Sequence, residues 1–159
     1  MEDYELFNRN TQAIIYGLQR NPIQRMLDFD FVSKREKQSV AAIIRPTQNA
    51  AISYHKVFYG NKEIVIPIYK TLDLAMKKHP NADVMINFAS FRSSYETSKE
   101  ALESDTIRTV VIIAEGIPER QSRKLIKIAE ERKKNIIGPA TVGGIVAGAF
   151  KIGNTAGTF

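Results

Sequence analysis

Residues 11–30, TQAIIYGLQRNPIQRMLDFD, decide the fold of this chain. They begin with an apolar run at 13–16, rich in β-branched residues, which predicts a buried strand that Gly17 ends. Asn21 is a suitable N-cap for a helix starting at Pro22, because proline there lacks only an N–H that would be unpaired anyway. The stretch is therefore predicted to be a strand, a tight turn and a helix.

The turn inside this stretch has the geometry of an anion site. In a parallel α/β sheet, such a turn points backbone N–H groups and the positive end of a helix dipole at whatever lies above the strand. A phosphate-bearing ligand would suit that position. An ordinary strand-to-helix connection without any ligand explains the same residues equally well.

The rest of the chain alternates strands with helices. A Gly60-Asn61 pair inside 54–69 predicts a hairpin or excursion that leads into a core strand. Apolar strands separated by helices predict an α/β fold, a Rossmann-like doubly wound, mostly parallel sheet with helices on both faces. The further strands are predicted at 39–44, 64–68, 83–88, 109–114 and 135–137, and the helices at 71–78, from about 94 to 103, and at 118–134.

Composition limits the classes to which the protein can belong. Its 159 residues suffice for one domain with a core, and 43% hydrophobic and 25% charged residues are ordinary for a globular protein. The absence of cysteine excludes disulfides and thiolate chemistry and fits a cytoplasmic location. No apolar run approaches the roughly 20 residues of a membrane span. We predict no membrane association and no metal site.

The formal net charge of +6 raises the question of nucleic acid. The basic residues are scattered, and the densest cluster, at 130–134, falls at a predicted helix C-terminus, where the dipole favours cations. No basic stripe with interleaved aromatic residues is present. We therefore predict no nucleic-acid partner, and a solvated surface accounts for most of the charge, with a polyanionic small ligand as a second contributor.

The usual ligand of this fold, a dinucleotide, does not fit the first turn. That turn reads GLQRNP (17–22) rather than G-x-G-x-x-G, and the second strand ends in Arg45 rather than in an acid for the ribose hydroxyl. An arginine there suits a phosphate on the ribose, as in coenzyme A or NADP. Gln19 and Arg20, which replace glycines, make NADP the weaker candidate.

A second polar turn, ASFRSS (89–94), precedes a predicted helix. Ser90, Arg92 and Ser93, together with the N–H groups of the helix start, could hold phosphate oxygens, and arginine would do so with a planar fork. The alternative is that one of the serines is only an N-cap and that Arg92 is a solvated surface residue.

Six stretches covering nearly the whole chain match one known family in order. The chain resembles the coenzyme A-binding domain of the succinyl-CoA synthetase α subunit and, more closely, the corresponding segment of ATP-citrate lyase and citryl-CoA synthetase. NFAS-R-S and IGPATVGGI are specific to the citrate branch, whereas EGIP and the KIG tail are shared more widely. The matching stretches are GLQRNPIQRMLDFDF (17–31), SVAAI (39–43), YGNKEIVIPIYK (59–70), DVMINFASFRSSYE (83–96), IRTVVIIAEGIPE (107–119) and IIGPATVGGIVAGAFKIGNTAG (136–157).

The resemblance implies a role in making citryl-CoA from citrate, coenzyme A and ATP through a phosphohistidine and citryl phosphate; the lyase then cleaves citryl-CoA to acetyl-CoA and oxaloacetate. It also implies roles for residues of this chain. Glu115 would be catalytic, facing the phosphohistidine, with Gly143 and Gly144 beside that centre. Without the family match, a helix-start acid explains Glu115 better. The implied coenzyme A-binding residues are Gly17, Gln19, Arg20, Asn21, Arg45, Pro46, Phe88, Ala89, Ser90, Arg92 and Ser93, of which Arg45 and Pro46 lie where the nucleotide end would be.

Compared with the family, the chain lacks the phosphorylated histidine and the ATP-binding domain. The phosphorylated histidine of the family lies in a second α/β domain, and the histidines here, His55 and His79, are predicted to be surface residues. No ATP-binding domain is present either. We therefore expect residues 1–159 to be a single coenzyme A-binding domain, a fragment that is inactive alone. Its expected partners are the remaining domains or subunits of an oligomeric enzyme, which would bind ATP and Mg²⁺. We also expect exposed apolar surface around 150–159.

Three alternatives remain at this point. An NAD(H)-sensing Rossmann-like regulatory or binding module would need no further domains, but the missing glycine motif and ribose-binding acid count against it. A stand-alone coenzyme A-binding scaffold would leave Glu115 without a role. A nucleic-acid binder rests on net charge alone.

Overall fold

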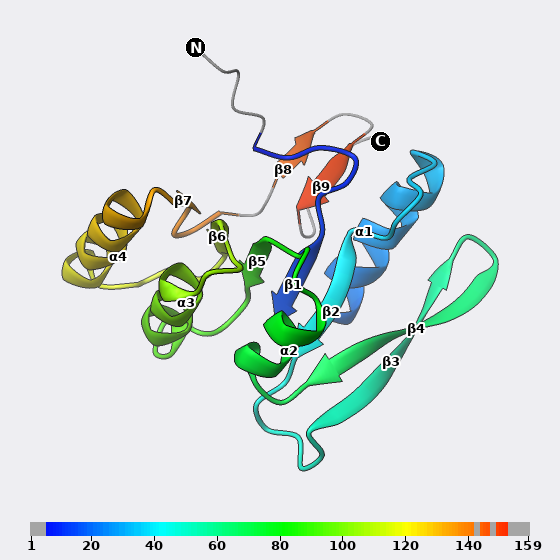
Figure 1. The fold of residues 1–159 in the computed structure, drawn as a ribbon, viewed down its shortest axis with the longest axis horizontal. Helices are drawn as coiled ribbons and strands as arrows, with labels where there is room; N and C mark the ends of the chain where they lie inside the picture. The colour runs from blue at the N-terminus through cyan, green and yellow to red at the C-terminus, as the bar shows by residue number, and fades with distance from the viewer. Residues whose placement is uncertain (1–5, 142–143, 147–148, 153–159) are drawn as a thin grey trace.

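A seven-stranded sheet forms the centre of the molecule (Figure 1). The computed structural model describes residues 6–141, 144–146 and 149–152. The strands are β1 (Ala13–Tyr16), β2 (Val40–Ile44), β3 (Ile52–Tyr59), β4 (Lys62–Tyr69), β5 (Val84–Asn87), β6 (Thr109–Ile112) and β7 (Asn135–Ile137). Their order across the sheet is β3-β4-β2-β1-β5-β6-β7, and every pair is parallel except β3 with β4.

Helices cover both faces of this sheet, as the sequence predicts. They are α1 (Arg20–Val32), α2 (Leu72–Lys78), α3 (Ser94–Glu103) and α4 (Glu119–Arg132). The apolar side of α1, carrying Ile23, Met26 and Leu27, packs into one core cluster. Helices α2, α3 and α4 contribute residues such as Leu72 and Leu125 to a second cluster on the opposite face. The doubly wound prediction is confirmed, and the helix positions follow from the apolar spacing.

Helix α1 begins earlier than the sequence predicts. Its N-cap is Gln19 and its first residue is Arg20, so the prediction of Asn21 as cap and Pro22 as first residue was wrong by two positions. The first intrahelical bond runs from the Ile23 N–H to the Gln19 carbonyl, at 3.1 Å. Proline is tolerated at the third position for the same reason as at the first, because the opening N–H groups of a helix lack intrahelical acceptors.

The predicted hairpin is formed by β3 and β4 around Gly60 and Asn61. Its inner side is buried beneath α1, whose Gln24 side chain accepts from the Phe58 N–H (3.0 Å) and donates to the Phe58 carbonyl (2.8 Å). The outer side stays exposed at Tyr54, Phe58 and Val65. One apolar side against α1 and one open side explain the partial alternation in the sequence.

A second, two-stranded sheet lies in the glycine-rich segment. It consists of β8 (Gly144–Val146) and β9 (Phe150–Ile152), paired antiparallel. Phe150 is fully buried and stacks on Phe7, with ring centroids 5.1 Å apart, and Ile152 is also buried. The expectation of exposed apolar surface at 150–152 was therefore wrong, because β9 packs against α1; residues 153–159 lie outside the described part of the chain.

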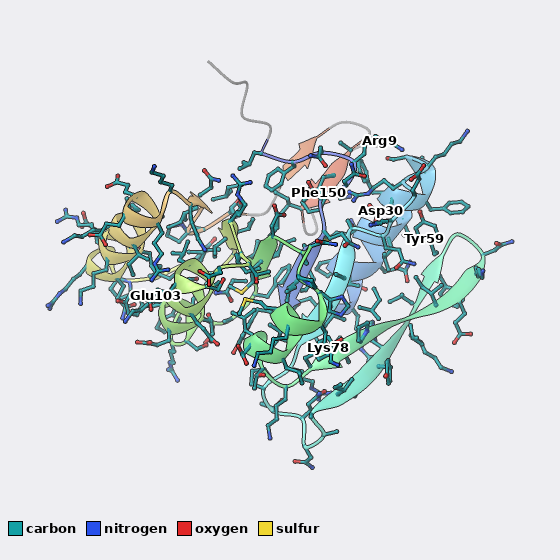
Figure 2. All side chains as sticks on the ribbon, viewed as in Figure 1. Arg9, Asp30, Tyr59, Lys78, Glu103 and Phe150 are labelled. Atoms are coloured by element: carbon teal, nitrogen blue, oxygen red, sulfur yellow. The ribbon has the colours of Figure 1, made fainter. Side chains whose placement is uncertain are left out.

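Arg35 forms hydrogen bonds that connect the start of β9 to the rest of the molecule. Its buried guanidinium donates to the carbonyls of Thr11 (2.5 Å), Ala149 (2.7 Å) and Lys37 (3.1 Å). Its carbonyl accepts from the Tyr59 hydroxyl at 3.0 Å. Figure 2 shows Tyr59 and Phe150 at the same end of the molecule as Asp30, which pairs with Arg35. Segments that are distant in sequence are thus joined at one point.

Among the residues that the structure describes, none of the helices combines the length and apolar character needed to cross a bilayer.

Candidate functional site

The predicted binding residues follow strands that end together. The hydrogen-bond ladder continues one residue beyond β1 and β5. The Gly17 N–H donates to the Ile44 backbone carbonyl (2.9 Å), and the Phe88 N–H donates to the Tyr16 backbone carbonyl (3.0 Å). The turns after β1, β2 and β5 therefore leave the sheet at the same level of its carboxyl edge. In open α/β sheets ligands bind at this edge.

The two predicted turns meet where the direction of winding reverses. From β1 the chain passes through α1 to β2 on one side, and β5 lies on the other side of β1. A Cβ placed on Gly17 would be 3.5 Å from the Cβ of Phe88, and Gly17 has φ of +103°, which favours glycine. The structure therefore brings the first turn and the second turn side by side at the topological switch point.

The first turn presents its residues to solvent. Gln19, Arg20 and Asn21 are exposed, Gln19 makes no side-chain capping bond, and the first turn of α1 contains no acidic residue. The positive field of Arg20 extends toward β3, where burial, and secondly the Arg20 charge, lower the pKa of the half-buried His55. The start of α1 is thus an electropositive surface with N–H donors.

Arg45 and Pro46 follow β2 directly and are exposed at the same edge. The Arg45 N–H donates to the Tyr69 carbonyl (2.9 Å), and its own carbonyl accepts from the Gln48 N–H (3.3 Å). The backbone of Arg45 is fixed on both sides, while its guanidinium reaches into solvent one strand away from Gly17.

The second turn combines a buried base with an exposed tip. Phe88 and Ala89 are half-buried, whereas Ser90, Arg92 and Ser93 are exposed. The guanidinium carbon of Arg92 lies 5.6 Å from the centre of the Phe91 ring. Ser93 occupies the N-cap position of α3 but its hydroxyl makes no capping bond. The hydroxyl is therefore available to another partner.

Asn87 is a residue of this turn that the sequence reasoning missed. It is fully buried and makes side-chain hydrogen bonds to α3 and to the Ala89 N–H. The signal that could have found it is a polar residue at the end of the apolar strand sequence DVMINF, immediately before a polar turn. A buried amide at such a position needs partners, and these lie in the turn and helix that follow.

Glu115 is exposed in the turn after β6, beside the segment that leaves β7. The two segments are linked by a hydrogen bond of 3.0 Å from the Ala140 N–H to the Ala114 carbonyl. Gly144 lies in β8, and a Cβ built on it would meet open space. Gly143 lies outside the described residues.

His55 lies within β3 and His79 at the C-cap of α2, so neither is in a turn that follows a parallel strand. Both are half-buried, so the prediction of surface positions holds only in part. The Nε2 atom of His79 lies 2.8 Å from the Tyr69 hydroxyl, and burial lowers the pKa of this histidine.

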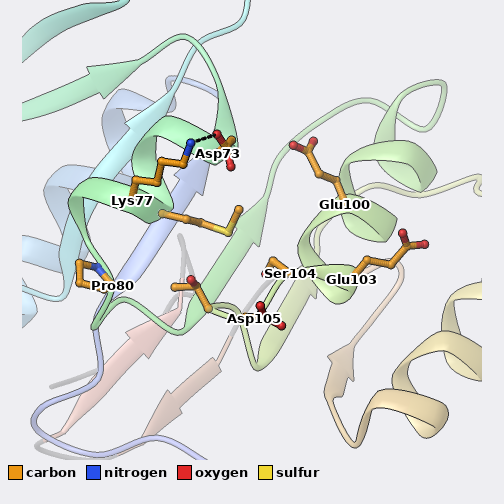
Figure 3. A pocket seen from close by; sticks show the side chains of 9 residues that line it. Asp73, Lys77, Pro80, Glu100, Glu103, Ser104 and Asp105 are labelled. Atoms are coloured by element: carbon orange, nitrogen blue, oxygen red, sulfur yellow. Dashed lines mark ion pairs between the residues drawn. The ribbon is translucent and has the colours of Figure 1, made fainter.

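A groove of about 590 Å³ lies elsewhere, between α2 and α3 (Figure 3). It extends to residues that precede β5 and β6, at the amino edge of the sheet. Its one basic side chain, Lys77, is paired with Asp73 at 2.9 Å. An acidic lining repels phosphates, so this groove does not suit a polyanionic ligand. Its lining residues are Asp73, Met76, Lys77, Pro80, Glu100, Glu103, Ser104, Asp105 and Thr106.

Comparison with known proteins places the chain in a wider context. The family described as CoA binding domain matches residues 8–116. The chain is 54% identical to ATP-citrate synthase beta chain protein 1 of Oryza sativa subsp. japonica over 154 residues, which are 97% of this chain and 25% of that protein. It is 53% identical to ATP-citrate synthase of Homo sapiens over 152 residues, which are 96% of this chain and 14% of that protein.

A solved structure has nearly the same backbone. The ATP citrate lyase from Methanothrix soehngenii, in complex with citrate and coenzyme A, matches with a TM-score of 0.94 at 58% identity. The match covers 99% of this chain and 25% of that chain. The chain thus spans about a quarter or less of the length of these relatives.

Proposed function

The chain belongs to the CoA-binding domain family, and on that premise we propose that it is the coenzyme A-binding module of an ATP-citrate lyase or citryl-CoA synthetase. The observation that carries this proposal is the meeting of Gly17 and Phe88 at the switch point. It joins two donor-rich turns at the carboxyl edge of the sheet, on a backbone shared with a lyase solved with coenzyme A.

The residues present fit a molecule with a diphosphate and a ribose phosphate. The start of α1 offers N–H groups and Arg20 without a competing acid. In the second turn, no acceptor lies within bonding distance of the N–H groups of residues 90–92 in the described part of the chain. Together with Arg92 and the Ser90 and Ser93 hydroxyls, these groups would hold phosphate oxygens and pantetheine. Arg45 and Pro46 would contact the nucleotide end.

In the complete enzyme, coenzyme A supplies the thiol that accepts the citryl group from citryl phosphate. We assign Glu115 the task of orienting or deprotonating an imidazole or this thiol, because its carboxylate is exposed in the turn after β6, at the carboxyl edge of the sheet. Gly143 and Gly144 would provide backbone N–H groups beside it. His55 lies within β3 and His79 at the C-cap of α2, and neither follows a parallel strand as the predicted binding residues do. The phosphohistidine and the ATP and Mg²⁺ sites are therefore assigned to partner domains or subunits.

Calorimetric titration of the purified chain tests this proposal. Coenzyme A should bind, 3′-dephospho-coenzyme A should bind more weakly, and NADH and NADPH should not bind. Binding of NADH without coenzyme A would favour the NAD(H)-sensing alternative. If none of the four binds, the isolated chain is not a coenzyme A-binding module.

A further inference from the structure

Asn87 connects the sheet, the second turn and helix α3 through one buried amide. Its Nδ2 group donates to the hydroxyls of Thr97 (2.7 Å) and Ser98 (2.9 Å), and lies 3.4 Å from the Ser94 carbonyl. Its Oδ1 atom accepts from the Ala89 N–H at 2.9 Å. The side chain is 0% exposed. Every polar atom of this buried amide is therefore used.

The chemistry of this network requires an amide. The Thr97 hydroxyl donates to the carbonyls of Ser93 (3.0 Å) and Ser94 (3.2 Å), so toward Asn87 it acts as an acceptor. The Ala89 N–H needs an acceptor at the same side chain. Asparagine supplies a donor and an acceptor from one short group, whereas aspartate supplies only acceptors and leucine supplies neither.

The bond to Ala89 sets the path of the turn. An asparagine side chain that accepts from the N–H two residues ahead forces the chain to turn immediately after the strand. The N–H groups of Ser93 and Ser94 then both close onto the Ser90 carbonyl, at 3.1 and 2.9 Å. The tip of the turn, with Arg92, is left as the part that faces outward.

We infer that Asn87 is a positioning residue for coenzyme A: without touching the ligand, it holds residues 88–93 in the conformation that presents Arg92 and the tip N–H groups. This inference rests on the proposed function. It predicts that the affinity for coenzyme A depends on a side chain that lies wholly beneath the turn.

The decisive experiment compares variants by calorimetry with coenzyme A and by amide hydrogen exchange without ligand. Asn87→Ala should lower the affinity for coenzyme A at least tenfold and increase exchange at the Ala89 amide. Ser94→Ala is the matched control, because the Ser94 Oγ atom is equally buried but has no partner in the described part of the chain. It should leave the affinity unchanged.

A double-mutant cycle separates positioning from general destabilisation. If Asn87 acts by placing Arg92, Arg92→Ala should lower affinity less in the Asn87→Ala background than in the unmutated chain. Additive losses, or an Asn87→Ala chain that binds as tightly as the unmutated chain, overturn the inference while the proposed function stands. If the unmutated chain does not bind coenzyme A, both the inference about Asn87 and the proposed function are wrong. Should Asn87→Ala not fold, Asn87→Asp and Thr97→Val decide the question by the same criteria.

Discussion

The Nε atom of Arg35 lies 3.8 Å from Oδ1 of Asp30, and neither side chain is exposed to solvent. Burial raises the pKa of Asp30 and lowers that of Arg35, and in each case the partner's charge acts in the opposite direction. The other oxygen of Asp30 accepts from the Ser39 N–H and hydroxyl, both at 2.7 Å. The buried carboxylate is therefore stabilised by the Ser39 donors and secondly by Arg35, and the buried guanidinium by its carbonyl acceptors together with Asp30.

Replacing Arg35 by methionine should destabilise the chain by about 3–5 kcal/mol, since it leaves the Asp30 carboxylate buried and unpaired. Urea unfolding followed by circular dichroism measures the change. Arg25→Met, at an exposed position on α1, is the control and should stay within about 0.5 kcal/mol. An Arg35→Met chain as stable as the control would contradict the assigned role of the pair.

Gly138 cannot accept a side chain without displacing the backbone. It has φ of +100°, and an added Cβ would lie 2.4 Å from the Ile112 carbonyl oxygen. Gly138→Ala should therefore destabilise the chain by at least about 2 kcal/mol in thermal unfolding, because strain and a backbone clash add. Gly144→Ala, where the added Cβ meets open space, should have a much smaller effect.

Ser94→Ala should leave stability unchanged or raise it by up to about 1 kcal/mol. The mutation removes a buried oxygen that has no hydrogen-bond partner in the described part of the chain. Thr97→Ala provides the contrast in the same helix, since the Thr97 hydroxyl bonds to Asn87 and to two carbonyls. It should lower the free energy of unfolding by about 1–3 kcal/mol in urea titrations. If Ser94→Ala lowers the free energy of unfolding as much as Thr97→Ala does, the prediction is wrong.

The stability of the chain should fall as the pH drops through the range in which His79 titrates. Burial lowers the pKa of His79 below its ordinary 6.5, so the unfolded chain binds the proton first. The contribution of His79 is complete above 6.5 and is lost as the pH falls through the folded-state pKa. Urea unfolding at about pH 7.5 and about pH 5.0 should show a smaller pH dependence for His79→Gln than for the unmutated chain. Because burial also lowers the pKa of His55, His55→Gln measures the second contribution separately.

Arg45 should distinguish coenzyme A from its dephosphorylated form. If its exposed guanidinium contacts the ribose 3′-phosphate, Arg45→Ala removes a charged hydrogen bond of about 1.5–3 kcal/mol, roughly a tenfold to hundredfold loss of affinity. The affinity for 3′-dephospho-coenzyme A should not change. Arg120→Ala on α4 is the control and should affect neither ligand. Equal losses of affinity for both ligands would mean that Arg45 contacts a part of coenzyme A other than the 3′-phosphate.

Local pattern was enough to predict the sheet and the two polar turns that follow β1 and β5. The apolar runs of β1 and β5 are buried on both sides, and the preference for right-handed crossovers makes them neighbours. That adjacency brings Gly17 to Phe88. These features follow from short-range composition and a general rule of chirality, so a single sequence contains them.

Features set by distant contacts could not be predicted in the same way. Phe150 sits in a glycine-rich segment that reads as loop, and only packing against α1 and Phe7 makes it a core residue. Asn87 reads as the polar end of a strand, and its role emerges only when α3 is placed beside it. The helix start at Gln19 rather than Asn21 reflects how α1 joins β1, which outweighs the preference of asparagine for a cap.

The stacking of Phe150 on Phe7 has a bearing on how the protein is made. On the ribosome, the face built by α2, α3 and α4 has all its helices once residue 132 has emerged. The opposite face holds α1, and its core cluster is complete only once β9, at residues 150–152, has also been made. The apolar side of α1 is therefore partly uncovered until residues 150–152 have been made. Contacts between positions so far apart in sequence are slow to form, which makes this face the one most in need of protection by chaperones during synthesis.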